Sequence, residues 1–259
     1  MLPKIFKPYK STKKNLIRMG PNTDGGYVID KRVIKKIKTL ITCGLNDDWE
    51  FEKEFFKINP NCKILAYDHT VNKKFWKNRF KKDLISFFLL KKLSIRKIID
   101  IFKYIDYINF FKKNNKHYIK KVVLKSKNKK EISIKKILKN KKNILLKIDI
   151  EGDEYKVLEP IKKNFQHIYL LIIEFHNIHK NIDKIKKFLM KSKLKLIHIH
   201  GNNYSGINKN KDPNVVEMTM LNSEKFKLSK NKSKFKYPIN DLDYVNFKRR
   251  NDIELRFND

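Results

Sequence analysis

Short runs of apolar and β-branched residues recur along the chain, and longer stretches with helical periodicity lie between them. Four of these runs have the composition of buried parallel strands, and they cover residues 39–43, 63–68, 143–150 and 168–175. A weaker run covers 117–125, and two further runs near the C-terminus cover 193–200 and 214–221. Because strands alternate with helices, the pattern predicts an α/β fold around a mostly parallel sheet with both faces covered.

We number the seven runs in chain order, so that 117–125 is the third. Helical stretches follow the first, fourth and fifth runs and cover residues 47–58, 151–164 and 181–192. In the first of them, Asp47 and Glu50 have the spacing of a capping box. A further stretch, 73–116, keeps amphipathic helical periodicity throughout and contains no strand run. Since one crossover helix does not need that length, we predict two or three helices inserted between the second and third strands. The insertion either caps apolar surface, or covers the substrate as a lid, or lies on a membrane surface.

Composition limits the class of protein. The chain has 259 residues, of which 41% are hydrophobic, so it can form a sizeable core and is not mostly disordered. We expect a single domain over 1–259, with the insertion at 73–116 and an extension at 222–259. Lysines interrupt every apolar run before the roughly 18 residues that a membrane helix needs, and the N-terminus lacks the apolar stretch of a secretory signal. Only two cysteines occur, too few for a disulfide framework. These features predict a cytoplasmic protein without a transmembrane segment, whose contact with a membrane would be peripheral.

The net charge of +35 would suit a nucleic-acid-binding protein, but the type of basic residue does not. Seven of the 62 basic residues are arginine, whose planar fork makes the bidentate contacts of base and phosphate recognition. The lysines are spread along the whole chain, and the abundance of Lys, Ile, Asn and Phe follows AT-rich codons. We interpret the charge mainly as a composition bias on solvated faces and expect no specific nucleic-acid partner.

In an open parallel sheet, ligands bind beyond the carboxyl ends of the strands. The first run is followed by Gly44, where the absence of a side chain lets the backbone approach a ligand and the next helix points its amides toward it. The second run ends at Asp68, 24 residues after Gly44, close to where an acidic residue commonly binds the hydroxyls of a nucleoside ribose. Each signal alone also fits an ordinary turn or helix cap. Together they favour a cofactor that contains adenosine.

Acidic and imidazole side chains follow the later runs. Asp149 and Glu151 are two residues apart, so both carboxylates point to one side at the end of the fourth run. Burying two carboxylates costs free energy, which favours a functional role for them. Alternatively, one could cap the next helix and the other could pair with a lysine. Similar groups end the fifth and sixth runs: Glu174 and His176, then His198 and His200 with Asn202 and Asn203. The seventh run contains an acid, Glu217, between apolar residues. Because a sheet gathers these ends, we expect the side chains to line one crevice.

The run LKIDIEGDEYKVL, which contains Asp149 and Glu151, resembles the central motif of FkbM-type S-adenosylmethionine-dependent methyltransferases. Further segments resemble one branch of that family in the same order: RMGPNTDGGYVI, TCGLNDDWEFE, AYDHT, IIEFHNI, and HIHGNN followed by VVEMTML. The resemblance extends from about Arg18 to Leu221 and does not clearly include the insertion. It implies the Rossmann-like class I methyltransferase fold, whose seven-stranded sheet has an antiparallel last strand.

The resemblance also implies an activity. The protein would transfer a methyl group from S-adenosyl-L-methionine to a hydroxyl of a small molecule or glycan, such as a sugar, a polysaccharide precursor or a metabolite. The cofactor-binding residues would be Gly44, Asn46, Asp48 and Asp68, the last of them at the ribose. We take as catalytic residues Asp149, Glu151, Glu174 and His176, and as acceptor-binding residues His200, Asn202 and Asn203.

A hydroxyl is a poor nucleophile near neutral pH, so the enzyme must accept its proton. We predict that Asp149 or His176 is the base and that Glu151 and Glu174 are positioning groups. These groups, with the acids and imidazoles of the last strands, could instead bind a divalent ion, although no compact metal motif supports it. Two other classes stay open. One is a polyanion- or RNA-binding protein, which the charge alone favours. The other is an inactive scaffold, since the glycine-rich loop of the family is reduced here to Gly44.

Overall fold

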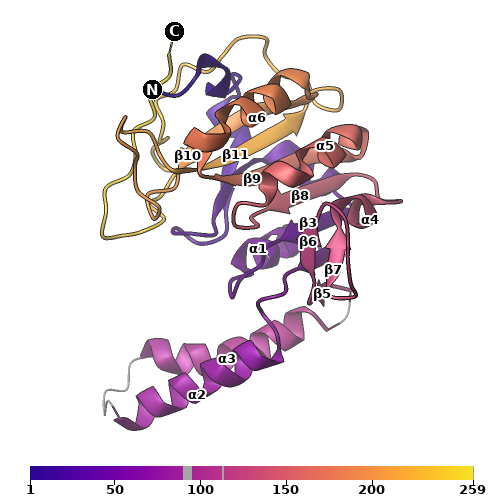
Figure 1. Ribbon diagram of the computed structural model, residues 1–259, viewed down its shortest axis with the longest axis vertical. Coiled ribbons are helices and arrows are strands. Elements are labelled where there is room, and N and C mark those ends of the chain that lie inside the picture. Colours follow the sequence, from indigo (N-terminus) through magenta and orange to yellow (C-terminus); the bar gives the residue numbers. More distant parts are fainter. Residues whose placement is uncertain (90–94, 113, 259) are drawn as a thin grey trace.

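The computed structural model describes residues 1–89, 95–112 and 114–258. A seven-stranded sheet runs through its centre (Figure 1), formed by β3 (Thr39–Cys43), β4 (Lys63–Tyr67), β5 (Lys116–Tyr118), β8 (Ile144–Ile148), β9 (Ile168–His176), β10 (Leu194–Gly201) and β11 (Val215–Asn222). Their order in the sheet is β10-β11-β9-β8-β3-β4-β5. β11 is antiparallel to β9 and β10, and the other neighbouring strands are parallel. The predicted fold class, with its antiparallel last strand, is confirmed.

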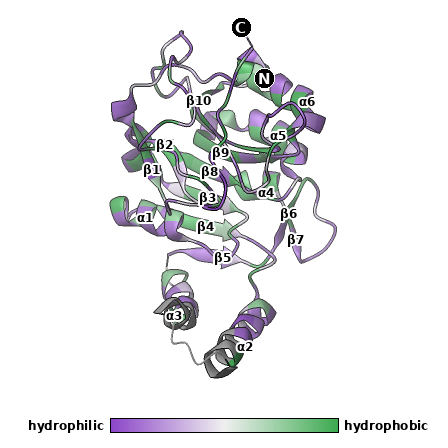
Figure 2. Cartoon of the chain, turned by 90° about the vertical axis from the view of Figure 1, so that its left-hand side faces the viewer, coloured by the Kyte–Doolittle hydropathy of each residue, from purple (hydrophilic) through white to green (hydrophobic). Residues whose placement is uncertain are grey.

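Helices lie between the strands along the chain, namely α1 (Glu50–Ile58), α4 (Ile134–Leu138), α5 (Glu154–Lys163) and α6 (Ile178–Lys191). α6 shows how a lysine-rich helix covers an apolar sheet. It buries Ile178, Ile185, Phe188 and Leu189, which recur at helical spacing and form one stripe. The strands beneath are apolar (Figure 2), and every residue of β8 and β11 is buried. The charged residues therefore stay on the solvated faces.

The insertion predicted between the second and third strands consists of α2 (Lys73–Leu89) and α3 (Ile95–Phe110), which project together from the sheet (Figure 1). Aromatic packing holds its base, because the Trp49 ring lies 6.2 Å from that of Trp76 and 5.5 Å from that of Tyr107. Trp49 Nε1 also donates a hydrogen bond of 2.9 Å to Asp106. The insertion buries apolar surface at this end, while a role as a lid or on a membrane stays a prediction. Among the described residues, no helix is long and apolar enough to cross a membrane.

The weak strand run at 117–125 is not one strand. β5 joins the edge of the main sheet, whereas β6 (Lys121–Val123) pairs in parallel with β7 (Glu131–Ser133) in a separate two-stranded sheet. A tight turn separates β5 from β6, because the Lys120 N–H donates to the Tyr118 carbonyl at 2.7 Å. The bend breaks the run into two short pieces.

The predicted capping box at the start of α1 is wrong. The N-cap residue is Trp49, which makes no side-chain cap, and Asp48 Oδ1 accepts the N–H of Glu50 at 2.9 Å instead. Asp47 forms an ion pair with Arg79 of α2. The insertion therefore brings a cation to Asp47, which no local spacing could show.

A second antiparallel pair, β1 (Leu16–Met19) and β2 (Tyr27–Asp30), precedes the main sheet. β2 lies against β11, where Thr219 Oγ1 donates a hydrogen bond of 2.6 Å to the Val28 carbonyl. The two ends of the chain lie side by side (Figure 1), and Leu2 forms a β-bridge with Phe257. The β1–β2 loop and the C-terminal segment meet beside the end of β10, where Asp24 Oδ1 accepts hydrogen bonds from Asn202 Nδ2 at 3.4 Å and Asn246 Nδ2 at 3.0 Å.

Candidate active site

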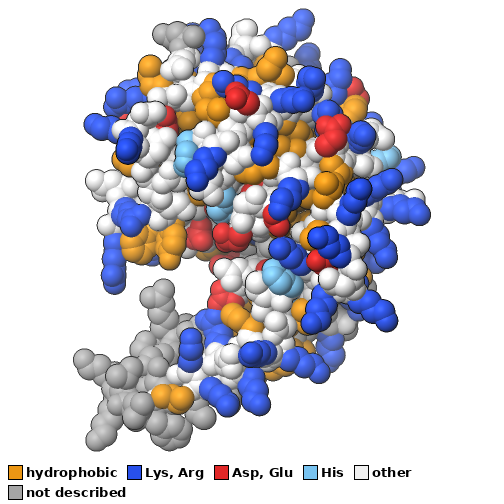
Figure 3. All heavy atoms as spheres, in the orientation of Figure 1, with side chains coloured by type: hydrophobic (Ala, Val, Ile, Leu, Met, Phe, Trp, Pro, Cys, Tyr) orange, Lys and Arg blue, Asp and Glu red, His pale blue; other side chains and the backbone are white. Residues whose placement is uncertain are grey.

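A pocket of about 290 Å³ lies at the carboxyl ends of β3, β4 and β8. Its polar wall contains Gly44 and Asn46 after β3, Asp68 after β4, and Asp149 and Glu151 after β8. The remaining lining residues are Tyr67, His69, Thr70, Phe75, Lys120, Lys121, Val122, Ile150 and Asp153. The sequence predicted a ligand at these strand ends. In Figure 3, acidic side chains gather at the hollow beside the helical insertion.

Gly44 is required where β3 and β8 end side by side. Its φ is 84°, and a Cβ atom there would lie 1.6 Å from the Asp149 carbonyl oxygen. The same crossing is held by a 2.8 Å hydrogen bond from the Asp149 N–H to the Cys43 carbonyl. The close approach that demands glycine is therefore between two segments of backbone, whereas the sequence suggested an approach to a ligand.

Asp68 binds the loop that follows β3. Its Oδ2 accepts the N–H groups of Leu45 and Asn46 at 2.9 and 2.8 Å, and its Oδ1 accepts the N–H and Oγ1–H of Thr70, both at 2.6 Å. Burial would raise the pKa of Asp68, but these hydrogen bonds hold it below its usual value. The carboxylate thus shapes the pocket wall with both oxygens, and its contact with a ribose stays a prediction.

Asp48 is the one predicted cofactor residue that lies outside this pocket. Besides capping Glu50, its carboxylate faces the β1–β2 loop, where a Cβ atom on Gly25 would lie 3.7 Å from Oδ2. Asn46 lines the pocket in the left-handed conformation, with φ 52°. The loop after β3 therefore turns Asn46 toward the pocket and Asp48 away from it.

The predicted catalytic residues come together at the ends of β8 and β9. Asp149, Glu151 and His176 each offer a donor atom, and these atoms lie within 4.8 Å of one another. His176 Nε2 is 3.5 Å from Glu151 Oε2 and 3.7 Å from Glu174 Oε1. Asp149 Oδ1 is buried and accepts no hydrogen bond. Three acids and one imidazole therefore lie close together beside the pocket, with Glu174 buried and Glu151 exposed to solvent.

The charges of this group depend on one another. Burial raises the pKa of Asp149 to about 7, although Lys147 and His176 lower it. Burial would lower the pKa of His176, but Glu154 and Asp149 raise it above its usual value. Burial, with help from Asp149, raises the pKa of Glu174 well above the usual range. Asp149 and His176 thus favour each other's charged form, whereas the charge of Asp149 disfavours ionisation of Glu174.

Residues 21–236 match the Methyltransferase FkbM domain. The chain belongs to this family of methyltransferases. Remotely similar solved structures include a fibrillarin pre-rRNA processing protein from Methanococcus jannaschii, with 10% identity and a TM-score of 0.37 over 73% of this chain and 67% of that one. A precorrin-6y C5,15-methyltransferase from Geobacter metallireducens has 10% identity and a TM-score of 0.35 over 73% and 85% of the two chains. TYW2 of M. jannaschii in complex with AdoMet has 11% identity and a TM-score of 0.35 over 82% of this chain and 89% of that one. No curated protein matches the sequence.

The central motif of this FkbM methyltransferase also contains Lys147, which the sequence analysis did not single out. Its ammonium is buried, 3.3 Å from Glu52 Oε1, and Glu52 also accepts the Thr42 hydroxyl at 2.6 Å. The Lys147 nitrogen lies 5.2 Å from the centre of the Tyr27 ring, which covers it. Burial would lower the pKa of Lys147, but Glu52 and the other nearby acids raise it. A lysine within an otherwise apolar strand was the signal that could have indicated this pair.

The three predicted acceptor-binding residues are buried and bonded to the protein itself. His200 pairs with Glu217 at 3.3 Å and with Asp252 at 3.0 Å. Asn202 Nδ2 donates to Glu174 Oε1 at 3.0 Å, so it touches the catalytic group directly. Asn203 Nδ2 donates to carbonyls of the C-terminal segment. Of the three, Asn202 is best placed to influence the site, and a contact of any of them with the acceptor stays a prediction.

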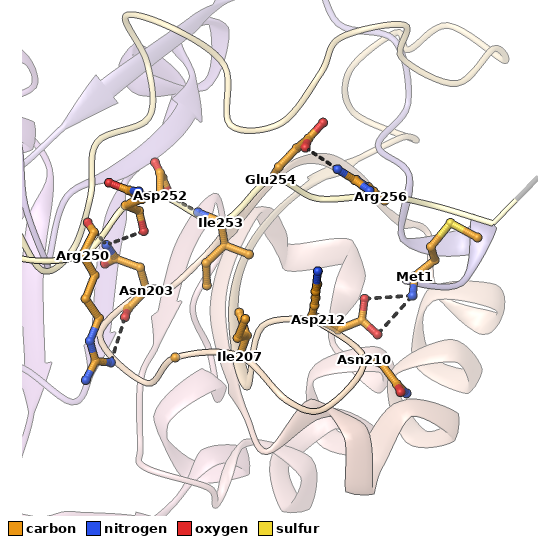
Figure 4. A pocket seen from close by; sticks show the side chains of 13 residues that line it. Met1, Asn203, Ile207, Asn210, Asp212, Arg250, Asp252, Ile253, Glu254 and Arg256 are labelled. Carbon is orange, nitrogen blue, oxygen red and sulfur yellow. Dashed lines mark hydrogen bonds and ion pairs between the residues drawn. The ribbon is translucent and has the colours of Figure 1, made fainter.

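Two of the predicted catalytic residues, Asp149 and Glu151, line the pocket of about 290 Å³, and a larger pocket of about 480 Å³ lies elsewhere. The larger pocket lies between the β10–β11 loop, the C-terminal segment and Met1 (Figure 4). Its walls are held by contacts such as the ion pair between the Met1 amino group and Asp212 and the hydrogen bond of Arg250 with the Asn203 carbonyl. None of the four predicted catalytic residues lines it. An active site at the ends of β3, β4 and β8 stays a prediction.

Asp149, Glu151 and His176 have the donor types that bind divalent ions. However, His176 places a positive charge 3.5 Å from Glu151 whenever it is protonated, so the acids can be neutralised without a metal ion. We expect methyl transfer to persist after exhaustive chelation, with no stoichiometric metal found by elemental analysis of the purified protein. Loss of turnover on chelation, with recovery on adding Mg²⁺ or Mn²⁺, would contradict this.

Proposed function

We propose that this FkbM methyltransferase uses S-adenosyl-L-methionine to O-methylate a hydroxyl of a small molecule or glycan, such as a sugar or a polysaccharide precursor, in the cytoplasm. The shared position of Asp149 and Glu151 carries the proposal. Both residues line the pocket, and both belong to the group around His176. A methyl donor bound in the pocket would therefore lie next to groups that can take a proton.

The residues present fit the cofactor. Phe75, Val122 and Ile150 supply apolar surface for an adenine ring, while Asn46 and Asp68 supply polar atoms. The volume of about 290 Å³ is close to the lower end of the range of roughly 300–1,000 Å³ found for ligand sites. When bound, S-adenosyl-L-methionine supplies an electrophilic methyl group on a sulfonium.

The residues of the chain then align the acceptor and receive its proton. In an in-line displacement, the oxygen–carbon bond forms as the carbon–sulfur bond breaks, so the acceptor oxygen must lie opposite the sulfur. We assign the alignment to Glu151 and Glu174, and the proton to Asp149 or His176. A pKa of about 7 for Asp149 suits this role, because a general base works best near its own pKa.

Cofactor binding tests the proposal. Titration calorimetry with S-adenosyl-L-methionine should show saturable binding, which Asp68→Ala should weaken about tenfold to a hundredfold, the cost of a lost hydrogen bond to a charged group. Asp68→Ala should also weaken binding because it frees the loop at Leu45 and Asn46, whose N–H groups Asp68 accepts. Asp241→Ala, which removes an exposed acid paired with Lys13, is the matched control and should bind as the wild type does.

Failure of the wild-type protein to bind the cofactor would overturn the proposal. It would favour the two other classes, an inactive scaffold or a polyanion-binding protein. The same samples titrated with a single-stranded RNA would separate these two, because only the latter predicts saturable binding that weakens steeply with salt.

A further inference from the structure

Glu154, the first residue of α5, lies behind the loop that carries Glu151. Its side chain is fully buried, although it is an acid at the start of a surface helix. Oε1 accepts the N–H groups of Gly152 at 2.9 Å and Ile150 at 3.3 Å. These bonds hold the loop in which both Glu151 and Gly152 have positive φ, at 54° and 94°. Glu154 therefore fixes the backbone that presents Glu151 to the site.

The same carboxylate contacts the imidazole of His176, with Oε1 2.9 Å from Nδ1. An ionised carboxylate can only accept hydrogen bonds, so Nδ1 carries the proton. Nε2 is then the atom that can gain or lose a proton. It faces Glu151 at 3.5 Å and Glu174 at 3.7 Å. The contact with Glu154 thus decides which nitrogen is turned to the reacting groups.

α5 also holds the main chain of His176. Tyr155 Oη donates a hydrogen bond of 2.6 Å to the His176 carbonyl. The Tyr155 ring stacks on Phe175, with 5.5 Å between ring centres. Neighbouring residues of one helix therefore fix both the backbone and the ring of the same histidine. Capping a helix needs neither the burial of Glu154 nor its contact with an imidazole, since a short polar side chain satisfies the first N–H groups.

We propose that Glu154 is a positioning residue, which holds His176 as the Nδ1–H tautomer and directs Nε2 to the site of proton transfer. The effect of Glu154 on catalysis rests on the proposed function, whereas its effect on the tautomer of His176 does not. The charged groups that face the ring are Asp149, Glu151, Glu154 and Glu174. Among the described residues, Glu154 is the acid that bonds Nδ1.

Nuclear magnetic resonance of the ring nitrogens tests this without an acceptor. Protein labelled with ¹⁵N-histidine is titrated with acid and base, and the His176 signals are assigned by their loss in His176→Asn. In the wild type, neutral His176 should be the Nδ1–H tautomer. Glu154→Gln removes the charge that raises the pKa of His176, so its titration midpoint should move to lower pH. Glu154→Ala removes the acceptor, so the Nε2–H tautomer should predominate, as in free histidine.

Glu159→Gln is the matched control, because Glu159 lies on the same helix with an exposed side chain, and it should leave both readouts unchanged. A wild-type His176 that is mainly Nε2–H, or an unchanged tautomer in folded Glu154→Ala, would overturn the proposal. The wild-type measurement decides even if neither variant at Glu154 folds. Calorimetry with S-adenosyl-L-methionine on the same samples separates the two proposals, because absent cofactor binding contradicts the proposed function and leaves the tautomer result standing.

Discussion

Asp149→Asn and His176→Ala are each expected to lower the turnover number about 10²–10⁴-fold, the range for loss of a general base. Either change removes one of the two groups that we propose as acceptors of the proton. His176 does not line the cofactor pocket, so His176→Ala should keep the affinity for S-adenosyl-L-methionine. The measurement is the initial rate of methyl transfer to the acceptor at saturating cofactor. His179→Ala, which removes an exposed histidine from α6, is the matched control and should keep the wild-type rate.

The pH dependence of kcat/KM for the same reaction should shift in each variant, which the rate at a single pH does not show. Because the base must be unprotonated, kcat/KM should rise with pH and level off above about 7, the pKa of Asp149. In Asp149→Asn the Asp149 charge no longer raises the pKa of His176, so the remaining rise should follow a His176 pKa that is lower than in the wild type. The His176 charge lowers the pKa of Asp149, so in His176→Ala it should move to higher pH. Wild-type rates and profiles in both variants would show that the group is structural.

Lys147→Met is expected to lower the free energy of unfolding by about 3–5 kcal/mol, because it leaves Glu52 as a buried charge without its partner. The side chain of Glu52 has no exposed surface, and that of Lys147 is 6% exposed. Burial of an unpaired carboxylate is costly, since neither water nor another cation can replace the ammonium. Urea denaturation followed by circular dichroism measures the change.

The double variant Lys147→Met with Glu52→Gln should recover most of the lost stability, because no charge then remains buried. An exposed pair gives the matched control. Lys13 and Asp241 are 50% and 85% exposed, so Lys13→Met should change the free energy of unfolding by less than about 1 kcal/mol. An equally small effect for Lys147→Met would mean that the buried pair is not ionised.

Most of the sheet could be predicted from local pattern. β3 covers the residues of the predicted run at 39–43, and β9 extends the run at 168–175 by one residue. Strands buried on both faces have continuous apolar sequences, so their ends can be located from the sequence alone. β5 lies at the sheet edge, where Lys116 and Tyr118 are exposed, and its signal was correspondingly weak. Its separation from β6 depends on a turn that hydrophobicity does not encode.

The candidate site was predictable in position but not in its connections. Strand order brought Asp149, Glu151 and His176 together, as expected from their places at strand ends. Asp48 also follows the end of a strand, yet its carboxylate accepts an N–H at the start of α1 and lies outside the pocket. Glu154 followed a recognisable helix-start pattern, but nothing near it in the sequence indicated the imidazole that it contacts.

By itself, the sequence determined the strands, their alternation with helices and the acids that follow them, because periodicity and chain order are properties of neighbouring residues. Only the tertiary structure decided which groups pair. Asp68 binds the loop at Asn46, Glu52 binds Lys147, and Glu154 binds His176, and these partners are 22, 95 and 22 positions apart in the sequence. Each pairing depends on distance and burial in three dimensions. Those quantities set the hydrogen bonds and pKa values of the site, and they exist only once the sheet has brought distant strand ends together.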